Sequence, residues 1–330
     1  MVSDGEIHLP PVELLELLSD GKLHSGQELA NLLGVSRTAV WKQLSKLEAL
    51  GLELESQPGR GYCLTGGLEF LNKQSINAEL PSSTIEHISQ FEILKIIDST
   101  NAYLLKQDPQ EKIMVCMAEC QTAGRGRRGR TWVSPFAKNI YLSLKMTLDS
   151  GLGALEGLSL AVGVAIVRSL INLGAQGVQL KWPNDVLWCG RKLGGILIEV
   201  VGDPSGRCHI VVGIGLNINA DKAMLVSIEQ PWVSLNEILG YRPVRNLVAA
   251  RLLNEVVALL TTYERDGFGV YRAEWEKLNA HAGLSVNLHL GSTVVAGFVR
   301  GVNATGALIL STDNGEQIFH GGEVSLRVAE

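Results

Sequence analysis

The apolar positions of residues 11–66 fall at helical spacing in three short segments. In the first segment, Leu14, Leu15 and Leu18 share one face, and Gly21 allows a left-handed ending. The second and third segments begin with serine caps, and Gly34 ends the second. The residues that carry the pattern in these two helices are Ser25 and Glu28 as a capping box, Leu29, Leu32 and Leu33, then Ser36, Val40, Leu44 and Leu47. We therefore predict three helices joined by short turns, the order of a helix-turn-helix.

The third of these helices has a polar and basic outer face with no acid before Glu48, which suits the major groove of DNA. Two alternating segments, residues 52–55 and 62–64, flank a turn and predict a hairpin, or wing. An alternative is a protein-interaction module, because the segment is acidic overall. For a winged helix-turn-helix in residues 1–66, the candidate DNA-contacting residues are Ser36, Arg37, Thr38, Trp41, Lys42 and, at the tip of the wing, Arg60.

The middle of the chain alternates between apolar runs of strand length and helical segments. Gly66 and Gly67 predict a hinge, and short helical pieces are expected at 70–80 and 84–89. A long apolar segment at 155–173 predicts a buried helix. Strands are expected at 91–97, from Ile113 toward Gln121, and at 139–148, 179–181, 196–201 and 209–213. Several strand ends carry lysine, asparagine, aspartate or glycine, the pattern of a site built along one edge or face of a sheet.

The last fifty residues alternate like strands of a small β-domain. Val286, Leu288 and Leu290 form one such stretch, and residues 324–328 form the last. Between them, the segments 303–306 and 313–315 have the composition of hairpin turns.

Composition narrows the class of protein. With 330 residues, 46% of them hydrophobic and 19% charged, the chain can form two or three globular domains. The formal charge of −5 argues against wholesale coating of nucleic acid, and the longest apolar run, residues 157–167, is too short to span a membrane. Five cysteines without a Cys-x-x-Cys pair indicate a reducing cytoplasm, and Cys116 and Cys120 are expected to be strand residues without zinc.

The strand that begins at Ile113 ends in a loop where glycine and arginine alternate. Glycine allows a close backbone approach, and the guanidinium groups offer forked donors to carboxylates and phosphates. The loop also matches a dinucleotide fingerprint, but that reading needs a following helix, whereas Pro135 and an alternating strand come next. The anion-binding candidates are Gly124, Arg125, Gly126, Arg127, Arg128, Gly129 and Arg130. A solvated basic loop is the alternative.

Two further clusters of polar residues follow strands. Asp98-Ser-Thr-Asn101 precedes a helical segment, where it can serve as an N-cap, a binding site or both. In Lys181-Trp-Pro-Asn-Asp185, lysine and aspartate flank a rigid Trp-Pro step, which is unusual for a simple turn.

Five ordered motifs together resemble bacterial biotin–protein ligases. They are Ile97-Asp-Ser-Thr-Asn101, Gln121-Thr-Ala-Gly-Arg-Gly-Arg-Arg-Gly-Arg130, Lys181-Trp-Pro-Asn-Asp185, Arg191-Lys-Leu-Gly-Gly195 and Gly213-Ile-Gly-Leu-Asn217. With the N-terminal helix-turn-helix, the chain is similar to the bifunctional form, ligase and biotin operon repressor together, over nearly all of its length. The resemblance implies an α+β multidomain protein: residues 1–66 winged helix-turn-helix, 67–280 a mixed α/β catalytic domain like that of class II aminoacyl-tRNA synthetases, and 281–330 an SH3-like β-barrel.

The resemblance also implies a reaction in two steps. Biotin and magnesium-ATP give biotinyl-5′-adenylate and pyrophosphate, and a lysine of the biotin carboxyl carrier protein of acetyl-CoA carboxylase then takes the biotin. Family members act as repressors on operator DNA as homodimers when the adenylate is bound. The implied protein is cytoplasmic and needs no membrane, and the ligands of magnesium (Mg2+) are unknown.

The same resemblance assigns residues to roles. The catalytic candidates are Lys192, Lys181, Arg127 and Asp185. The biotin candidates are Ser99, Thr100, Asn101, Gln121, Gly124, Arg125, Gly126, Arg127 and Lys192. The nucleotide candidates are Arg130, Trp132, Asn217 and Trp232, the last expected to close over adenine. Asp185 either orients or deprotonates the incoming lysine or helps to hold magnesium.

Two alternative functions remain open at this point. Lipoate and octanoyl ligases resemble the same catalytic fold, although the arginine-glycine loop favours biotin. A biotin-sensing regulator without carrier transfer is the other alternative, and the intact Lys181 and Lys192 speak against it.

Overall fold

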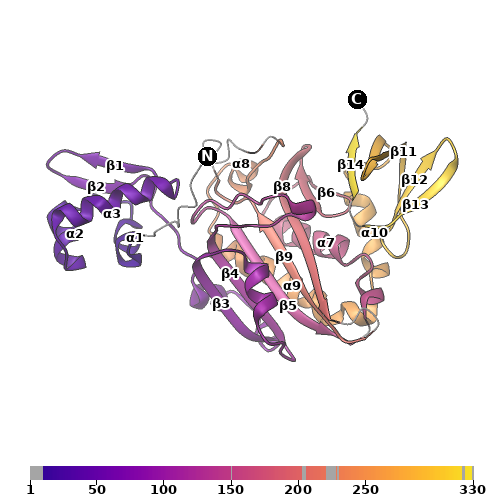
Figure 1. Cartoon of the computed structure of the whole chain (residues 1–330), viewed down its shortest axis with the longest axis horizontal. Helices are drawn as coiled ribbons and strands as arrows, with labels where there is room; N and C mark the ends of the chain where they lie inside the picture. The colour runs from indigo at the N-terminus through magenta and orange to yellow at the C-terminus, as the bar shows by residue number, and fades with distance from the viewer. Residues whose placement is uncertain are drawn as a thin grey trace.

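The computed structural model describes residues 10–149, 151–202, 206–220, 228, 230–321 and 324–328. Within these residues the strands form a two-stranded, a seven-stranded and a five-stranded sheet. Figure 1 shows them in a row along the long axis, with the N-terminal helices and hairpin at one end and the C-terminal sheet at the other. The large sheet lies between them.

The N-terminal part is a winged helix-turn-helix, as predicted. It consists of α1 (Val12–Leu18), α2 (Gly26–Leu33), α3 (Arg37–Ala49) and a hairpin of β1 (Leu54–Gln57) and β2 (Gly61–Leu64). The capping box of α2 is present, and Gly34 ends that helix in the left-handed conformation. Two predicted bounds were wrong. Helix α1 ends at Leu18 with Ser19 as its cap, before Gly21, and β1 begins at Leu54 because Leu52 is buried in the helical core.

The predicted hinge is a turn held from both sides. Gly66 and Gly67 have φ values of 73° and 64°. A Cβ at Gly67 would lie 2.5 Å from the carbonyl oxygen of Ser19, so only glycine fits. The amide of Leu68 donates to the same oxygen at 2.9 Å, and Arg242 Nη1 donates to the carbonyl of Gly66 at 2.8 Å.

The seven-stranded sheet has the order β3-β4-β5-β9-β8-β7-β6. Strands β3 and β4 are parallel, and every other pair is antiparallel. The strands are β3 (Ile88–Ile97), β4 (Ile113–Gln121), β5 (Ile140–Leu148), β6 (Val178–Lys181), β7 (Asp185–Trp188), β8 (Arg191–Gly202) and β9 (Cys208–Leu216). Cys116 and Cys120 are buried residues of β4, as expected.

Two parts of this sheet extend further than predicted. Strand β7 was not predicted, and β8 already begins at Arg191, which makes Lys192 a strand residue. Strand β9 does not break at Gly213 but continues through Leu216. The glycines stay in the strands because β9 is paired on both sides, with β5 and β8. The prediction of a helical piece at 84–89 was also wrong, since α5 (Ser82–Ile85) ends at Ile85 and β3 begins at Ile88.

Helices cover both faces of the sheet. Helix α6 (Thr100–Lys106) contacts β4, β5 and β9 on one face, whereas α7 (Leu158–Ile171) and α9 (Arg245–Asp266) pack against each other and the other face. Helix α7 is almost completely buried, as its composition predicted. The remaining helices are α4 (Lys73–Ala78), α8 (Leu235–Leu239) and α10 (Gly269–Leu278). No element had been predicted for α8 to α10. None of the described helices is long and apolar enough to cross a membrane.

The C-terminal part is an antiparallel sheet in the order β13-β12-β11-β10-β14. Its strands are β10 (Ser285–Leu290), β11 (Thr293–Val302), β12 (Leu308–Thr312), β13 (Gly315–Phe319) and β14 (Val324–Val328). The predicted alternation is confirmed at Val286 and Leu288, whose side chains are buried. Both predicted hairpin turns join neighbouring strands.

Candidate active site

A cavity of about 1020 Å³ lies at one end of the large sheet. Its walls come from the start of α6, the arginine-glycine loop, the turn before β7, strands β8 and β9, and strand β14 of the C-terminal sheet. The predicted catalytic and ligand-binding residues that line it are Ser99, Thr100, Asn101, Gln121, Arg125, Gly126, Arg127, Arg130, Trp132, Lys181, Asp185, Lys192, Asn217 and Trp232. Residues from five separate motifs therefore meet in one cavity.

One end of the cavity is polar and uncharged. Thr100 donates to Gln121 Oε1 through both its amide, at 2.9 Å, and its hydroxyl, at 3.0 Å. Ser143 of β5, which no motif had indicated, donates to Thr100 Oγ1 at 2.7 Å and shares a contact of 2.6 Å with Asn101 Oδ1. Ser99 caps α6, since its hydroxyl accepts from the amide of Ala102 at 3.4 Å. The two readings of this cluster, cap and binding site, are thus compatible.

The arginine-glycine loop closes one side of the cavity. It contains a single 3-10 turn at Arg127–Gly129 and leads into β5, which rules out the helix of a dinucleotide site. Gly124 and Gly129 are the predicted loop residues that do not line the cavity. Gly124 lies against the residues that follow the loop. A Cβ there would lie 2.9 Å from Ser134 Oγ, so glycine allows the loop to pack against the chain that follows.

Arg127 points into the site from this loop. Its Nη1 donates to Asn184 Oδ1 at 3.0 Å. Burial lowers the pKa of this guanidinium, although the nearby Asp185 opposes that effect. A partly desolvated arginine interacts more strongly with an anion than a fully hydrated one does.

Lysine and aspartate form an ion pair on the neighbouring strands. Lys192 Nζ lies 2.7 Å from Asp185 Oδ1, and both side chains are largely buried. Strands β7 and β8 set this distance, because they are paired from Asp185 opposite Gly195 to Trp188 opposite Arg191. Burial also lowers the pKa of Lys181, which the charge of Asp185 partly counteracts.

The indole of Trp132 packs over Gly215 of β9, and both residues line the cavity. A Cβ at Gly215 would come closest to Cε2 of this ring and would lie 2.7 Å from its Nε1. The Lys192 ammonium is 5.5 Å from the ring centroid, within range of a cation–π interaction. Trp132 Nε1 is buried and has no hydrogen-bond partner among the described residues.

Asn217 joins three segments around the opposite end. Its side chain accepts from Asn139 Nδ2 at 3.3 Å and donates to the carbonyls of Lys192, at 3.4 Å, and Val233, at 3.3 Å. Trp232 bridges to Lys192, because the amide of Lys192 donates to Pro231 and the amide of Val233 donates to Lys192, both at 2.9 Å. The loop that carries Trp232 is therefore tied to β8. Residue 229 of this loop, which spans 228–235, lies outside the described residues.

Several residues that line the cavity were missed as ligand-binding candidates. Asn184 lay within a recognised motif, and its side chain also donates to the carbonyl of Ile196 at 2.9 Å. Leu326 and Arg327 come from β14, in the C-terminal sheet. No signal in the sequence connects β14 to a site whose other residues lie more than ninety positions earlier.

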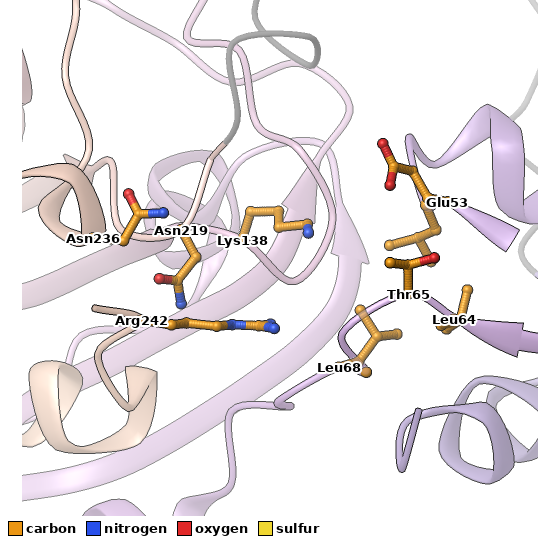
Figure 2. Close-up of a pocket in the computed structure, with 10 residues that line it drawn as sticks. Glu53, Leu64, Thr65, Leu68, Lys138, Asn219, Asn236 and Arg242 are labelled. Atoms are coloured by element: carbon orange, nitrogen blue, oxygen red, sulfur yellow. The ribbon is translucent and has the colours of Figure 1, made fainter. Parts of the chain in front are cut away.

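A second, smaller cavity of about 240 Å³ lies between the N-terminal part and the central part. Figure 2 shows Leu64, Thr65 and Leu68 on one side and Lys138, Asn219 and Arg242 on the other. None of the predicted catalytic or ligand-binding residues lines it.

The six predicted DNA-contacting residues line neither cavity and lie on the winged helix-turn-helix. Ser36, Arg37, Thr38, Trp41 and Lys42 are exposed on or beside α3, and Arg60 is exposed at the tip of the hairpin. Trp41 is 60% exposed, which is unusual for a tryptophan and leaves its ring available to a partner.

Comparisons with known proteins agree with this architecture. A model of the biotin/lipoate A/B protein ligase family matches residues 93–217, a helix-turn-helix domain matches 13–63, and a biotin protein ligase C-terminal domain matches 281–327. Among solved structures, the biotin protein ligase from Aquifex aeolicus in complex with biotin and ATP is 28% identical, with a TM-score of 0.64. It covers 73% of this chain and all of its own.

Fold and cavity thus define a protein of the biotin and lipoate protein ligase class. The bifunctional ligase/repressor BirA of Escherichia coli is 39% identical over 321 residues, covering 97% of this chain and 98% of its own length. BirA of Bacillus subtilis is 28% identical and covers 95% of this chain and 98% of its own length. The chain belongs to the family of bifunctional biotin ligase/repressor proteins.

Proposed function

We propose that the protein is an ATP-dependent biotin–protein ligase that forms biotinyl-5′-adenylate and transfers biotin to a lysine of biotin carboxyl carrier protein. The observation that carries this proposal is one cavity with two chemically different ends. Uncharged polar groups line one end, around Thr100 and Gln121, and cations line the other, around Lys192 and Arg127.

The uncharged end suits the ureido ring of biotin, which is neutral and has both donors and acceptors. Buried hydroxyls and amides can bind such a ring without the cost of desolvating a charge. Ser99, Thr100 and Asn101 are all at least 96% buried. Lipoate has no ureido group, so its ring could not exchange ureido hydrogen bonds with these polar groups.

The cationic end suits the first chemical step. The biotin carboxylate attacks the α-phosphate of ATP, and both reactants are anionic. Lys192, Lys181 and Arg127 reduce that repulsion and stabilise the charge that develops on the phosphate. Trp132, Asn217 and Trp232 line the same cavity, and they are the side chains proposed to flank the adenosine.

Magnesium reaches the site as part of the substrate, magnesium-ATP. Among the described residues that line the cavity, Asp185 is the one carboxylate. The described residues contain no group of three or more histidine, cysteine, aspartate or glutamate side chains placed to hold a metal. This fits a magnesium ion held mainly by phosphates and water.

In the second step the amine of the carrier lysine attacks the acyl carbonyl of the adenylate and AMP leaves. The amine must lose a proton to attack, and Asp185, a carboxylate that lines the cavity, can accept it. The ion pair with Lys192, at 2.7 Å, keeps Asp185 oriented toward the cavity.

We also propose that the protein represses transcription from operator DNA as a homodimer with the adenylate as corepressor. The exposed basic face of α3 supports DNA binding. The pairing of β8 with β7 stops at Gly195, whereas its pairing with β9 continues to Gly202. Ile196 is still hydrogen-bonded to Asn184, and beyond it β8 has no strand partner on this side among the described residues. Such an edge can pair with the same strand of a second copy.

The proposed domain boundaries are 1–66, 67–280 and 281–330. The two-, seven- and five-stranded sheets fall one in each segment. A cytoplasmic location is also proposed, and it is supported by five cysteines that are all free thiols.

Exchange of pyrophosphate into ATP with purified protein and magnesium tests the first step. Biotin, lipoate and octanoate are compared at equal concentration, and only biotin is expected to stimulate exchange. Transfer of labelled biotin to a carrier domain tests the second step. Exchange with biotin but no labelling of the carrier would instead favour a biotin-sensing regulator, and the absence of exchange from folded protein would contradict the ligase function.

A further inference from the structure

Glu199 of β8 connects the uncharged end of the cavity to the arginine-glycine loop. Its Oε2 accepts a hydrogen bond from Asn101 Nδ2 at 2.8 Å, and its Oε1 accepts from Arg125 Nη1 at 3.0 Å. One carboxylate therefore holds two residues that lie 98 and 74 positions away in the sequence. Glu199 itself belongs to none of the five motifs.

The first contact determines how the side-chain amide of Asn101 is oriented. A carboxylate accepts hydrogen bonds and cannot donate them when ionised, so Nδ2 rather than Oδ1 must face Glu199. The carbonyl of Leu197 accepts from the same Nδ2 at 3.3 Å. On the other side, Asn101 Oδ1 contacts the hydroxyl of Ser143 at 2.6 Å. Gly213 leaves no room for the amide to move away, since a Cβ there would lie 2.8 Å from Asn101 Cγ.

The second contact holds the loop. The loop has few internal contacts of its own, among them the amide of Gly126 donating to the carbonyl of Arg130 at 2.7 Å and a bridge between Arg125 and Thr131. The ion pair of Arg125 with Glu199 ties this loop to a paired strand of the sheet. The side chains of Arg125 and Glu199 are 40% and 24% exposed, so salt should weaken their attraction.

We propose that Glu199 is a positioning residue that orients Asn101 for biotin and tethers Arg125, so that the loop retains the adenylate. This inference rests on the proposed function of the same cavity. Glu199 contacts neither the reacting atoms nor the substrate, and it acts through its two partners. The two contacts give separate effects. Orientation of Asn101 affects biotin binding, and the tether on Arg125 affects how long the intermediate stays bound.

Two substitutions separate these effects. Glu199→Gln has nearly the same shape and keeps an oxygen for Asn101, but it presents an amide nitrogen to Arg125 and removes the ion pair. Glu199→Ala removes both contacts. The full-length protein is loaded with labelled biotin and ATP, and escape of the adenylate is followed after a chase with unlabelled biotin. KM for biotin and kcat are measured by pyrophosphate exchange.

We expect escape to be about 3- to 10-fold faster for Glu199→Gln, with KM for biotin and kcat within twofold of wild type. Glu199→Ala should show the same faster escape and, in addition, a KM for biotin raised about tenfold. Escape from the wild type should accelerate between 0.05 and 0.5 M salt, while escape from Glu199→Gln should change little. A purely structural effect would not produce this division between KM, kcat and salt dependence.

A double substitution tests whether the tether acts through Arg125. In an Arg125→Gln background, Glu199→Gln should add nothing to the rate of escape. Glu274→Gln is the matched control, because it breaks an ion pair with Arg168 of similar exposure between α7 and α10, away from the cavity. It should leave escape and KM unchanged.

The inference would be overturned if the adenylate escaped from Glu199→Gln at the wild-type rate. It would also be overturned if Glu199→Gln accelerated escape equally in the wild-type and Arg125→Gln backgrounds. An equal rise in KM for both substitutions would overturn the role of Asn101. These failures are distinct from a failure of the proposed function, in which the wild type itself shows no exchange. Fluorescence titration with biotin, which needs no activity, then compares the affinity of wild type, Glu199→Gln and Glu199→Ala. Equal affinity for all three overturns the inference.

Discussion

Replacing Gly215 with alanine should displace the indole of Trp132, which packs over this glycine in the cavity. The new methyl group would lie 2.7 Å from two atoms of the ring and nearer still to Cε2. Ordinary contacts between carbon atoms are about 3.5 Å, so the ring must retreat by at least roughly 0.8 Å, and by more at Cε2. The strand cannot move instead, because Gly215 is paired with Tyr141 on one side and Gly195 on the other.

A shift of this size at the nucleotide end should lower kcat/KM for ATP by about 10- to 100-fold. The free energy of unfolding should fall by only about 1 to 3 kcal/mol, since one ring adjusts at the cavity wall. Gly213→Ala gives the complementary test, because its methyl group would lie 2.8 Å from Asn101 Cγ, at the biotin end. For that variant, KM for biotin rather than KM for ATP should rise.

Pyrophosphate exchange at varied biotin and varied ATP measures both effects, and urea denaturation measures stability. Gly269→Ala is a suitable control, since nothing lies within 4 Å of the added carbon. If Gly215→Ala raised KM for biotin and left KM for ATP unchanged, the assignment of Trp132 to the nucleotide would be refuted.

Three further results are expected. Lys192→Ala should reduce adenylation by about 10²- to 10³-fold with the fold intact, as circular dichroism would show, because it removes a cation and leaves Asp185 without its partner at 2.7 Å. Near wild-type adenylation would contradict this role. Arg127→Gly removes the hydrogen bond to Asn184, and labelled adenylate should escape about tenfold faster, whereas unchanged retention would contradict the prediction. Burial lowers the pKa of His281 from 6.5 to about 4, so the unfolded chain binds more protons in this range and stability falls as pH falls. Between pH 7 and pH 5 the loss should be about 2 kcal/mol in urea titrations, and it should disappear in His281→Gln.

Local signals were sufficient for the winged helix-turn-helix. The capping box at Ser25 and Glu28 and the helix end at Gly34 involve neighbours within a few residues, and both appear in the structure as predicted. The same holds for the alternation at Val286 and Leu288. Where a contact is local, residue type and spacing already contain the information.

Local signals failed where pairing across the sheet overrides them. Gly213 and Gly215 are weak strand formers, yet β9 continues through both because it is paired on each side and because Asn101 and Trp132 occupy the space above them. Pairing with β7 likewise starts β8 at Arg191, which places Lys192 beside Asp185.

The sequence by itself determined the chemistry of the cavity. Five motifs specified its lysines, arginines, amides and hydroxyls, and all but one of the predicted catalytic and ligand-binding residues line a single cavity. Only the tertiary structure decided which other side chains complete it. Glu199 reaches Asn101 across 98 residues, and Arg327 enters from the C-terminal sheet. Such contacts depend on strand register and on how the domains pack, and spacing along the chain carries no information about either.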